Sequence, residues 1–216
     1  YFGTWYFVTW YLVFLRDGAI VRVQGRNNQV SVKGRVIGLK KSIIGNDNIV
    51  EIEESTLVEC RIRIRGNGNK LQIQKGCMIG KECSFWLEGN NNTIIIGQNT
   101  TMTLRCHFNA QEHDTRIVVG EDCMFSNNII VRTSDSHPIY NKNGERINKA
   151  RDVIIGNHVW IAPSSVIMKG ADIGDGSVIG SHSLVNKSVP NNCLAVGMPS
   201  KVVKEEIRWT RDNVLK

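Results

Sequence analysis

Apolar residues recur at every sixth position in the last third of the chain. The series is Ile155, Ile161, Ile167, Ile173, Ile179 and Val185, and a small or short residue follows each by four: Val159, Ser165, Ala171, Ser177, Ser183 and Val189. A period of six matches neither an α-helix nor a hairpin meander. It predicts a solenoid in which each hexapeptide forms one flat side and one corner, and three sides make a coil of about 18 residues whose parallel strands stack at ~4.8 Å.

The preceding part of the chain repeats the same unit less regularly. Clusters of Gly and Asn, which tolerate positive φ and therefore mark corners, occur at residues 25–28, 45–48, 66–69 and 89–92. A short alternating strand follows each cluster. The apolar positions Val32, Ile52, Ile73, Ile96, Val119 and Ile155 are separated by 20, 21, 23, 23 and 36 residues. These steps predict coils enlarged by residues extruded at the corners, and an inserted loop in the last step.

The six cysteines show no CxxC pair and no spacing of metal ligands. Four of them, Cys77, Cys83, Cys106 and Cys123, occupy the small position of a hexapeptide, where a free Cys behaves as a small buried hydrophobe. We therefore expect reduced, buried thiols and a cytoplasmic protein.

The aromatic residues are concentrated at the N-terminus, where eight of the 15 Phe, Trp and Tyr fall between Tyr1 and Phe14. The uncharged residues 1–15 are shorter than the ~20 apolar residues that cross a bilayer. Residues 1–19 are predicted to form a cap or contact segment, and association with a membrane surface through residues 1–15 is the alternative.

The most informative stretch is residues 137–203, which read HPIYNKNGERINKARDVIIGNHVWIAPSSVIMKGADIGDGSVIGSHSLVNKSVPNNCLAVGMPSKVV. This stretch resembles the sugar and polysaccharide O-acetyltransferases of the hexapeptide-repeat acyltransferase family. The resemblance implies an all-β fold, a left-handed parallel β-helix, and a homotrimer with active sites at the subunit interfaces. The β-helix domain is expected over residues 20–199, with an inserted loop at 132–152. The apolar pattern after Pro199 predicts a short C-terminal helix in the tail, residues 200–216.

The resemblance identifies His137 in the loop as the catalytic residue, 23 positions before Trp160. A sugar hydroxyl is a poor nucleophile, and an imidazole within hydrogen-bond reach can take its proton as the oxygen attacks the thioester of acetyl-CoA. Asp135 is either a second catalytic residue that orients the imidazole or a solvated loop carboxylate. No Cys/His pair or serine elbow indicates an acyl-enzyme, so direct transfer is expected.

By resemblance, acetyl-CoA is the co-substrate and lies along the last coils. Its expected contacts, from the thioester to the phosphates, are Trp160, Ala162, Ser181, Asn186, Lys201 and Lys204. The two lysines would also be explained as solvated charges at the start of a helix.

Of the other histidines, His107 is expected to line the acceptor pocket together with Asn109. His107 and His113 also raise the possibility of a zinc site, but three convergent imidazoles are needed and no third ligand is found, so no metal is predicted. His158 and His182 stand at exterior corner positions and are expected at the surface.

The sequence favours an acetyl-CoA-dependent O-acetyltransferase for a sugar or surface polysaccharide. The alternatives are an acetyltransferase for another small acceptor, such as an antibiotic hydroxyl, a serine or a sugar amine, and a non-catalytic scaffold, which would not need the loop His. The net charge of +7 is spread along the chain without a nucleic-acid motif, and is better explained by attraction to CoA phosphates and an anionic glycan.

Overall fold

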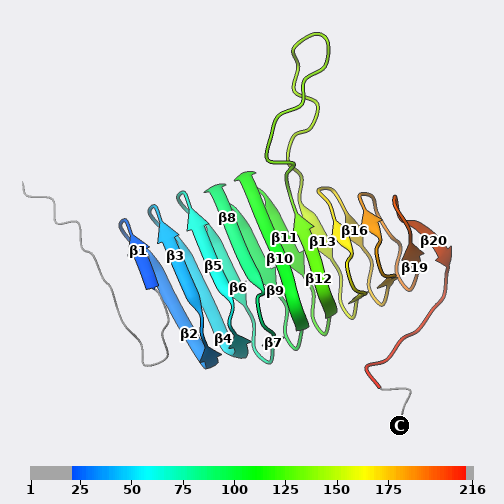
Figure 1. Cartoon of the computed structure of the whole chain (residues 1–216), viewed down its shortest axis with the longest axis horizontal. Helices are drawn as coiled ribbons and strands as arrows, with labels where there is room; N and C mark the ends of the chain where they lie inside the picture. The colour runs from blue at the N-terminus through cyan, green and yellow to red at the C-terminus, as the bar shows by residue number, and fades with distance from the viewer. Residues whose placement is uncertain (1–20, 213–216) are drawn as a thin grey trace, which may run out of the picture.

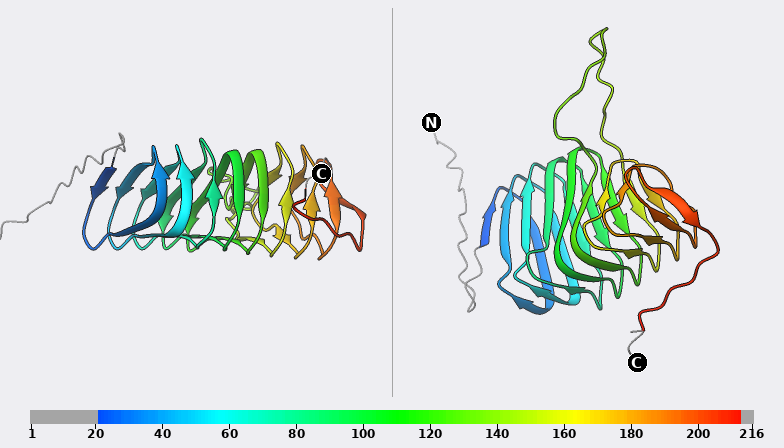
Figure 2. Two further views of the ribbon diagram at one scale, coloured as in Figure 1. Left: turned by 90° about the horizontal axis from the view of Figure 1, so that it is seen from below. Right: turned by 45° about the vertical axis from the view of Figure 1, so that its right-hand side comes forward.

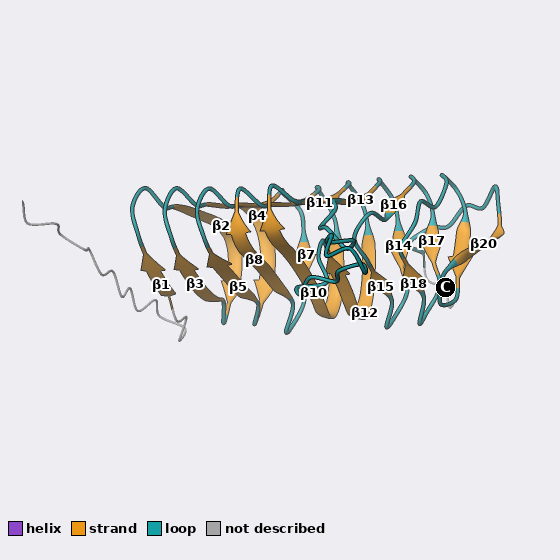
Figure 3. Cartoon of the chain, turned by 90° about the horizontal axis from the view of Figure 1, so that it is seen from above, coloured by secondary structure: helices purple, strands orange, loops and turns teal. Residues whose placement is uncertain are grey.

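The computed structural model describes residues 21–212, which form a parallel β-solenoid with a loop projecting from its flank (Figure 1). The aromatic segment predicted as a cap or contact surface, residues 1–19, lies outside the described residues. Each coil has three sides, here called A, B and C. The strands of successive coils stack side by side, so each side is a row of strands along the solenoid. Figure 3 shows these strands joined by loops.

Side A contains β1 (Val21–Gln24), β3 (Lys40–Ile44), β5 (Arg61–Arg65), β8 (Ser84–Asn90), the second halves of β10 (Thr101–His113) and β12 (Met124–Arg132), β15 (Val166–Ile167) and β18 (Leu184–Val185). Side B contains the first halves of β2 (Gln29–Ile37) and β4 (Ile49–Val58), β6 (Lys70–Ile73), β9 (Thr93–Ile96), β11 (Arg116–Val119), β13 (Val153–Ile155) and β16 (Asp172–Ile173). Side C contains the second halves of β2 and β4, β7 (Met78–Ile79), the first halves of β10 and β12, β14 (Trp160–Ile161), β17 (Val178–Ile179) and β19 (Leu194–Val196).

The strand register confirms the predicted repeat. Along side B, each apolar residue lies opposite the corresponding residue of the next coil: Val30, Val50, Leu71, Ile94, Ile117 and Val153. The long last step contains the inserted loop, and beyond it Ile155 pairs with Ile173 in the regular six-residue part.

The extra residues of the N-terminal coils do more than enlarge the corners. On side A, β5 has five residues and β8 has seven, whereas β15 and β18 have two each. The additional residues therefore lengthen the strands of this side, and side A is broad in the N-terminal coils and narrow in the C-terminal ones.

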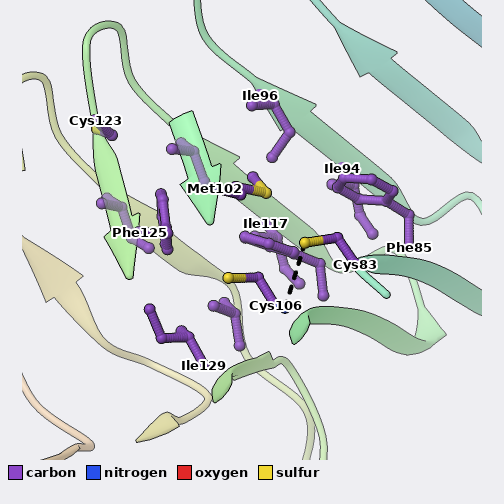
Figure 4. Close-up of a cluster of buried hydrophobic side chains, with 14 of the residues drawn as sticks. Cys83, Phe85, Ile94, Ile96, Met102, Cys106, Ile117, Cys123, Phe125 and Ile129 are labelled. Atoms are coloured by element: carbon purple, nitrogen blue, oxygen red, sulfur yellow. Dashed lines mark hydrogen bonds between the residues drawn. The ribbon is translucent and has the colours of Figure 1, made fainter. Parts of the chain in front are cut away.

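The core is a stack of inward-facing apolar side chains (Figure 4). Phe85, Phe108 and Phe125 follow one another in consecutive coils with ring centroids 5.5 Å apart. All six cysteines are free and buried, and the backbone N–H of Cys106 donates to the Cys83 thiol. The predicted packing role of the cysteines is confirmed.

Buried asparagines connect the coils at the corner between sides A and B. Asn69 donates from its side chain to Asn48 Oδ1 (3.1 Å) and accepts at Oδ1 from the backbone N–H of Asn92 (3.0 Å). The ladder continues to Thr115 and Thr133, at the base of the loop. Gly66 (φ 128°) allows the close stacking, because a Cβ there would lie 1.8 Å from the carbonyl oxygen of Gly89.

The predicted C-terminal helix is wrong for the described residues. Lys201–Lys204 forms strand β20, which pairs antiparallel with β19, and an extended tail follows to Asp212 (Figure 2). The open backbone edge of β19 offers hydrogen-bond partners that a short helix would not use. Within residues 21–212 there is no helix long and apolar enough to cross a membrane.

Candidate functional site

The inserted loop leaves β12 after Arg132 and returns to β13 at Val153, and it forms an arm that projects from the corner between sides A and B (Figure 1). Tyr140 and Arg146 form an antiparallel bridge across the arm. A tight turn closes the tip, where the backbone N–H of Asn141 donates to the carbonyl of Glu145 (2.9 Å). The arm therefore has internal structure of its own.

Glu112, at the end of β10, ties the arm to the solenoid. Its carboxylate receives hydrogen bonds from both terminal nitrogens of Arg146, at 2.6 and 2.8 Å, and one from Ser134 Oγ at 2.6 Å. The hydrogen bond from Arg146 is the main reason why the pKa of Glu112 lies below its ordinary value. A bidentate Arg–carboxylate pair fixes direction as well as distance.

A second set of contacts holds the neck of the arm. Asp135 Oδ2 accepts from Lys169 Nζ of the next coil (2.5 Å) and from Asn148 Nδ2 (2.9 Å), and Lys169 Nζ also donates to the carbonyl of Asn148 (2.8 Å). Burial raises the pKa of Asp135, but the hydrogen bonds from Lys169 and Asn148 outweigh it, and the net pKa is below the ordinary value. Asp135 is therefore an anion held by two donors.

His137 follows this neck with its side chain exposed. Its carbonyl accepts from Asn148 Nδ2 (2.9 Å), and the Asn148 Oδ1 accepts from the backbone N–H of Ile139 (2.7 Å), so one buried amide fixes the backbone on both sides of the histidine. Among the described residues no hydrogen bond joins the His137 ring to Asp135. Asp135 was expected either to orient the imidazole or to be a solvated loop carboxylate, and its carboxylate is engaged instead with Lys169 and Asn148.

Sequence reasoning missed Lys169, Asn148, Arg146 and Glu112. The hydrogen bonds that involve these residues join distant positions: His137 and Asn148 are 11 apart, Asp135 and Asn148 are 13 apart, and the pairs Asp135–Lys169 and Glu112–Arg146 are each 34 apart. The hexapeptide pattern indicates which positions face outward but does not identify which outward residues meet the loop.

Trp160 lies half-buried on β14, on side C. Trp209 of the C-terminal tail approaches it with ring centroids 6.0 Å apart and stacks on His158 at 4.0 Å. The Trp209 indole N–H donates to the His158 carbonyl (2.9 Å), and His158 Nδ1 lies 2.6 Å from Asp122. His158 was expected at the surface, but the tail covers one of its faces.

The remaining residues expected at CoA lie on the last coils. Ser181, Asn186, Lys201 and Lys204 are exposed, and the two lysines are carried by β20, not by a helix. Ala162 is buried, and its backbone N–H already donates to the carbonyl of Ile179 (2.8 Å), so this N–H is not free for a ligand.

The broad part of side A contains a groove of about 710 Å³. Here called the side A groove, it is lined on β5, β8, β10 and β12 by outward-facing residues that include Arg61, Arg63, Trp86, His107, Asn109 and Arg132. His107 and Asn109 both line this groove, and their role at the acceptor stays a prediction. Sequence reasoning missed the arginines and the tryptophan.

His107 is held by Ser84, whose hydroxyl lies 2.8 Å from Nδ1. Burial is the main cause of a lowered His107 pKa, so the ring is neutral at neutral pH. His113 lies six residues further along β10, about 20 Å away at ~3.3 Å per residue. Among residues 21–212, no group of three His, Cys, Asp or Glu side chains has an arrangement that would hold a metal ion.

Comparison with known proteins gives the family. The model "Bacterial transferase hexapeptide (six repeats)" matches residues 152–187. A polysialic acid O-acetyltransferase of Neisseria meningitidis is 34% identical over 87% of this chain and 88% of its own length. One of Escherichia coli O1:K1 / APEC is 40% identical over 42% of this chain, and the match spans 30% of that protein.

A solved structure of a polysialic acid O-acetyltransferase superposes with a TM-score of 0.81, at 37% identity, covering 88% of this chain and 90% of the other. A second, a polysialic-acid-specific acetyltransferase, gives 0.77 at 34% identity, with 88% of each chain covered. The similarity extends over the N-terminal coils as well as the regular hexapeptides. The chain therefore belongs to the hexapeptide-repeat acetyltransferases.

Proposed function

We propose that this protein transfers an acetyl group from acetyl-CoA to a hydroxyl of a polysaccharide, with His137 as the general base. The observation that carries the proposal is the arm, which fixes the backbone around an exposed imidazole through Asn148. The relatives that match nearly the whole chain are named for O-acetylation of polysialic acid, which supports a polysaccharide acceptor.

The reaction needs one proton acceptor. His137 takes the proton of the acceptor hydroxyl as its oxygen attacks the acetyl carbonyl. The tetrahedral intermediate then collapses, the carbon–sulfur bond breaks, and the thiolate leaves as free CoA after taking a proton. Imidazole is the side chain that serves most often as a general base in enzymes.

Asp135 acts in this proposal as a positioning residue. Its hydrogen bonds to Lys169 and Asn148 hold the neck from which His137 extends, so it influences the imidazole through the backbone. In this proposal Asp135 does not contact the His137 ring directly.

Acetyl-CoA is proposed to lie along side C of the last coils. The half-buried ring of Trp160 offers an apolar surface for the pantetheine arm, and the exposed lysines Lys201 and Lys204 offer charge for the phosphates. Ser181, at the corner between sides C and A, and Asn186, which directly follows β18 on side A, are the further proposed contacts. Ala162 can contribute only its carbonyl or methyl group.

The decisive experiment replaces His137 by Ala and measures thiol release from acetyl-CoA with polysialic acid as the first acceptor, with product detection by NMR. Turnover should fall by roughly 10²- to 10⁴-fold, while acetyl-CoA still binds. His113→Ala is the matched control, because it removes an exposed histidine that lies on β10 and outside the arm, and it should retain full activity. Equal turnover in both variants would refute the base assignment.

We also propose the trimeric assembly and the cytoplasmic location that the family resemblance implies. Sedimentation should show a species of three chains, and an active monomer would contradict an active site shared between subunits.

A further inference from the structure

The side A groove has features that the proposed chemistry does not require. From Arg132 on β12 it crosses β10 and β8 to Arg61 on β5. Three strand spacings of ~4.8 Å make this about 14 Å. Its volume of about 710 Å³ lies within the range of pockets that bury most of a drug-sized ligand. A groove of this length has room for more than one sugar ring.

The groove carries unbalanced positive charge. Lys40, Arg61, Arg63 and Arg132 line it, together with the carboxylates Glu59 and Glu82. The two carboxylates are already paired with residues outside the lining, Glu59 with Lys81 (3.3 Å) and Glu82 with Arg105 (2.8 Å). No carboxylate in the described part of the chain forms an ion pair with Arg61 or Arg63. These two guanidinium groups are available to an anionic ligand.

Trp86 lies between the arginines of β5 and the polar residues of β10. The guanidinium carbon of Arg63 is 4.6 Å from the centre of the Trp86 ring, and the indole N–H is buried without a hydrogen-bond acceptor. The indole nitrogen is the only buried side-chain atom without a hydrogen-bond partner found within residues 21–212. The ring itself is partly exposed in the groove and offers an apolar surface to a sugar.

Arg132 joins the groove to the arm. Its side chain lines the groove and donates to the carbonyl of Ser134 (2.6 Å) and to Ser136 Oγ (2.8 Å), one residue before His137. A polysaccharide that lies in the groove is therefore directed toward the neck of the arm, which carries the proposed catalytic residue His137.

We propose that the side A groove binds a run of acidic sugar units of the acceptor polysaccharide. Arg61 and Arg63 bind carboxylates, and Trp86 packs against a sugar ring. This inference rests on the proposed function, because it adds binding subsites for other sugar units of the polymer that is acetylated. It makes the enzyme selective for anionic chains longer than a single unit.

The test measures glycan binding in a background that cannot turn over. Polysialic acid is titrated calorimetrically into His137→Ala protein, alone and combined with Arg63→Gln, Trp86→Leu or Arg35→Gln. Arg35 is an exposed arginine on β2, on side C, and its replacement removes the same charge elsewhere. Arg63→Gln and Trp86→Leu should each weaken binding roughly tenfold or more, about 1.4 kcal/mol, and Arg35→Gln by less than twofold.

Three further measurements complete the test. Carboxyl-reduced, neutral polysialic acid should bind the parent protein no more tightly than the acidic polymer binds Arg63→Gln, because it loses the contacts of both arginines. Longer sialic acid oligomers should gain affinity over a dimer in the parent and lose most of that gain in Arg63→Gln. Trp86→Phe, which retains an aromatic ring, guards against misfolding of Trp86→Leu and should bind with intermediate affinity.

The two proposals fail separately. Full turnover in His137→Ala would overturn the base assignment, and absence of acetyl transfer to any polysaccharide by the unaltered protein would overturn the proposed function. Loss of turnover in His137→Ala, together with equal glycan affinity in Arg63→Gln and Arg35→Gln, would overturn only the groove. Absence of binding to both polysialic acid and polygalacturonate would also overturn it.

Discussion

Lys169 Nζ lies 2.5 Å from Asp135 Oδ2, and this contact joins one coil of the solenoid to the neck of the arm formed by the coil before it. The lysine side chain is 13% exposed and the aspartate 27%. The pair is therefore more than a surface ion pair, and it reaches the backbone of His137 through Asn148.

Lys169→Met should lower turnover by roughly 10- to 100-fold, because small displacements of a catalytic group are costly. The Michaelis constant for acetyl-CoA should stay constant. Asp135→Asn should behave similarly, and the double variant should be no worse than the worse single variant, because both remove one contact. Lys75→Met, at an exposed position, serves as the control. Additive losses in the double variant would contradict a shared role.

The pair of Glu112 and Arg146 predicts a pH dependence. Because the pKa of Glu112 is lower in the folded chain than its ordinary value of 4.5, its contribution to stability is complete above pH 4.5 and is lost as pH falls through the lowered pKa. The protection of the arm's amides against hydrogen exchange, corrected for the intrinsic pH dependence of exchange, should therefore decrease as pH falls below 4.5. Glu112→Gln should remove this step, and an unchanged pH profile in that variant would assign the step to another carboxylate.

Asn69→Ala should destabilise the solenoid more than Asn67→Ala. Loss of the buried Asn69 amide leaves the Asn92 N–H and the Gly89 carbonyl without partners, at a cost of about 2–4 kcal/mol. Asn67 makes a similar coil-to-coil contact at the surface, where water can replace it. Urea denaturation of the two variants gives the comparison, and equal midpoints would show that the buried ladder contributes no more than the exposed one.

Lys41→Met should stabilise the protein at neutral pH by about 1 kcal/mol. Lys41 points inward opposite Ile62, and burial lowers its pKa from the ordinary 10.5. The folded chain therefore binds this proton less tightly than the unfolded chain, which costs stability at all pH values below the lowered pKa. The cost disappears as pH rises toward 10.5. The gain in melting temperature should accordingly shrink at alkaline pH, and a less stable variant at pH 7 would refute the assignment.

The sequence predicted the coil architecture because one small unit is repeated, and each repeat tests the same assignment. The register of Val30, Val50 and Leu71 agrees with the predicted steps. The tail from Lys201 occurs once, and its short apolar pattern does not distinguish a helix from a strand on an available edge.

The same reasoning explains what was missed at the site. The family resemblance indicated His137 as a candidate, but Lys169 and Asp135 meet only because coils stack, and their separation of 34 residues includes a loop of irregular path. Trp86 and Arg63 face outward as alternation requires. Whether they line a groove together depends on which side of the solenoid is broad, and the six-residue period does not indicate which side that is.

The ladder of Asn48, Asn69 and Asn92 has a consequence for the length of the chain. Loss of one residue within a strand would turn inward-facing side chains outward, whereas removal of one whole N-terminal coil would bring equivalent amides together again. The N-terminal coils carry most of the side A groove, and the arm with His137 lies beyond them. Evolution can therefore lengthen or shorten the surface that holds the polymer, coil by coil, without altering the chemistry performed on it.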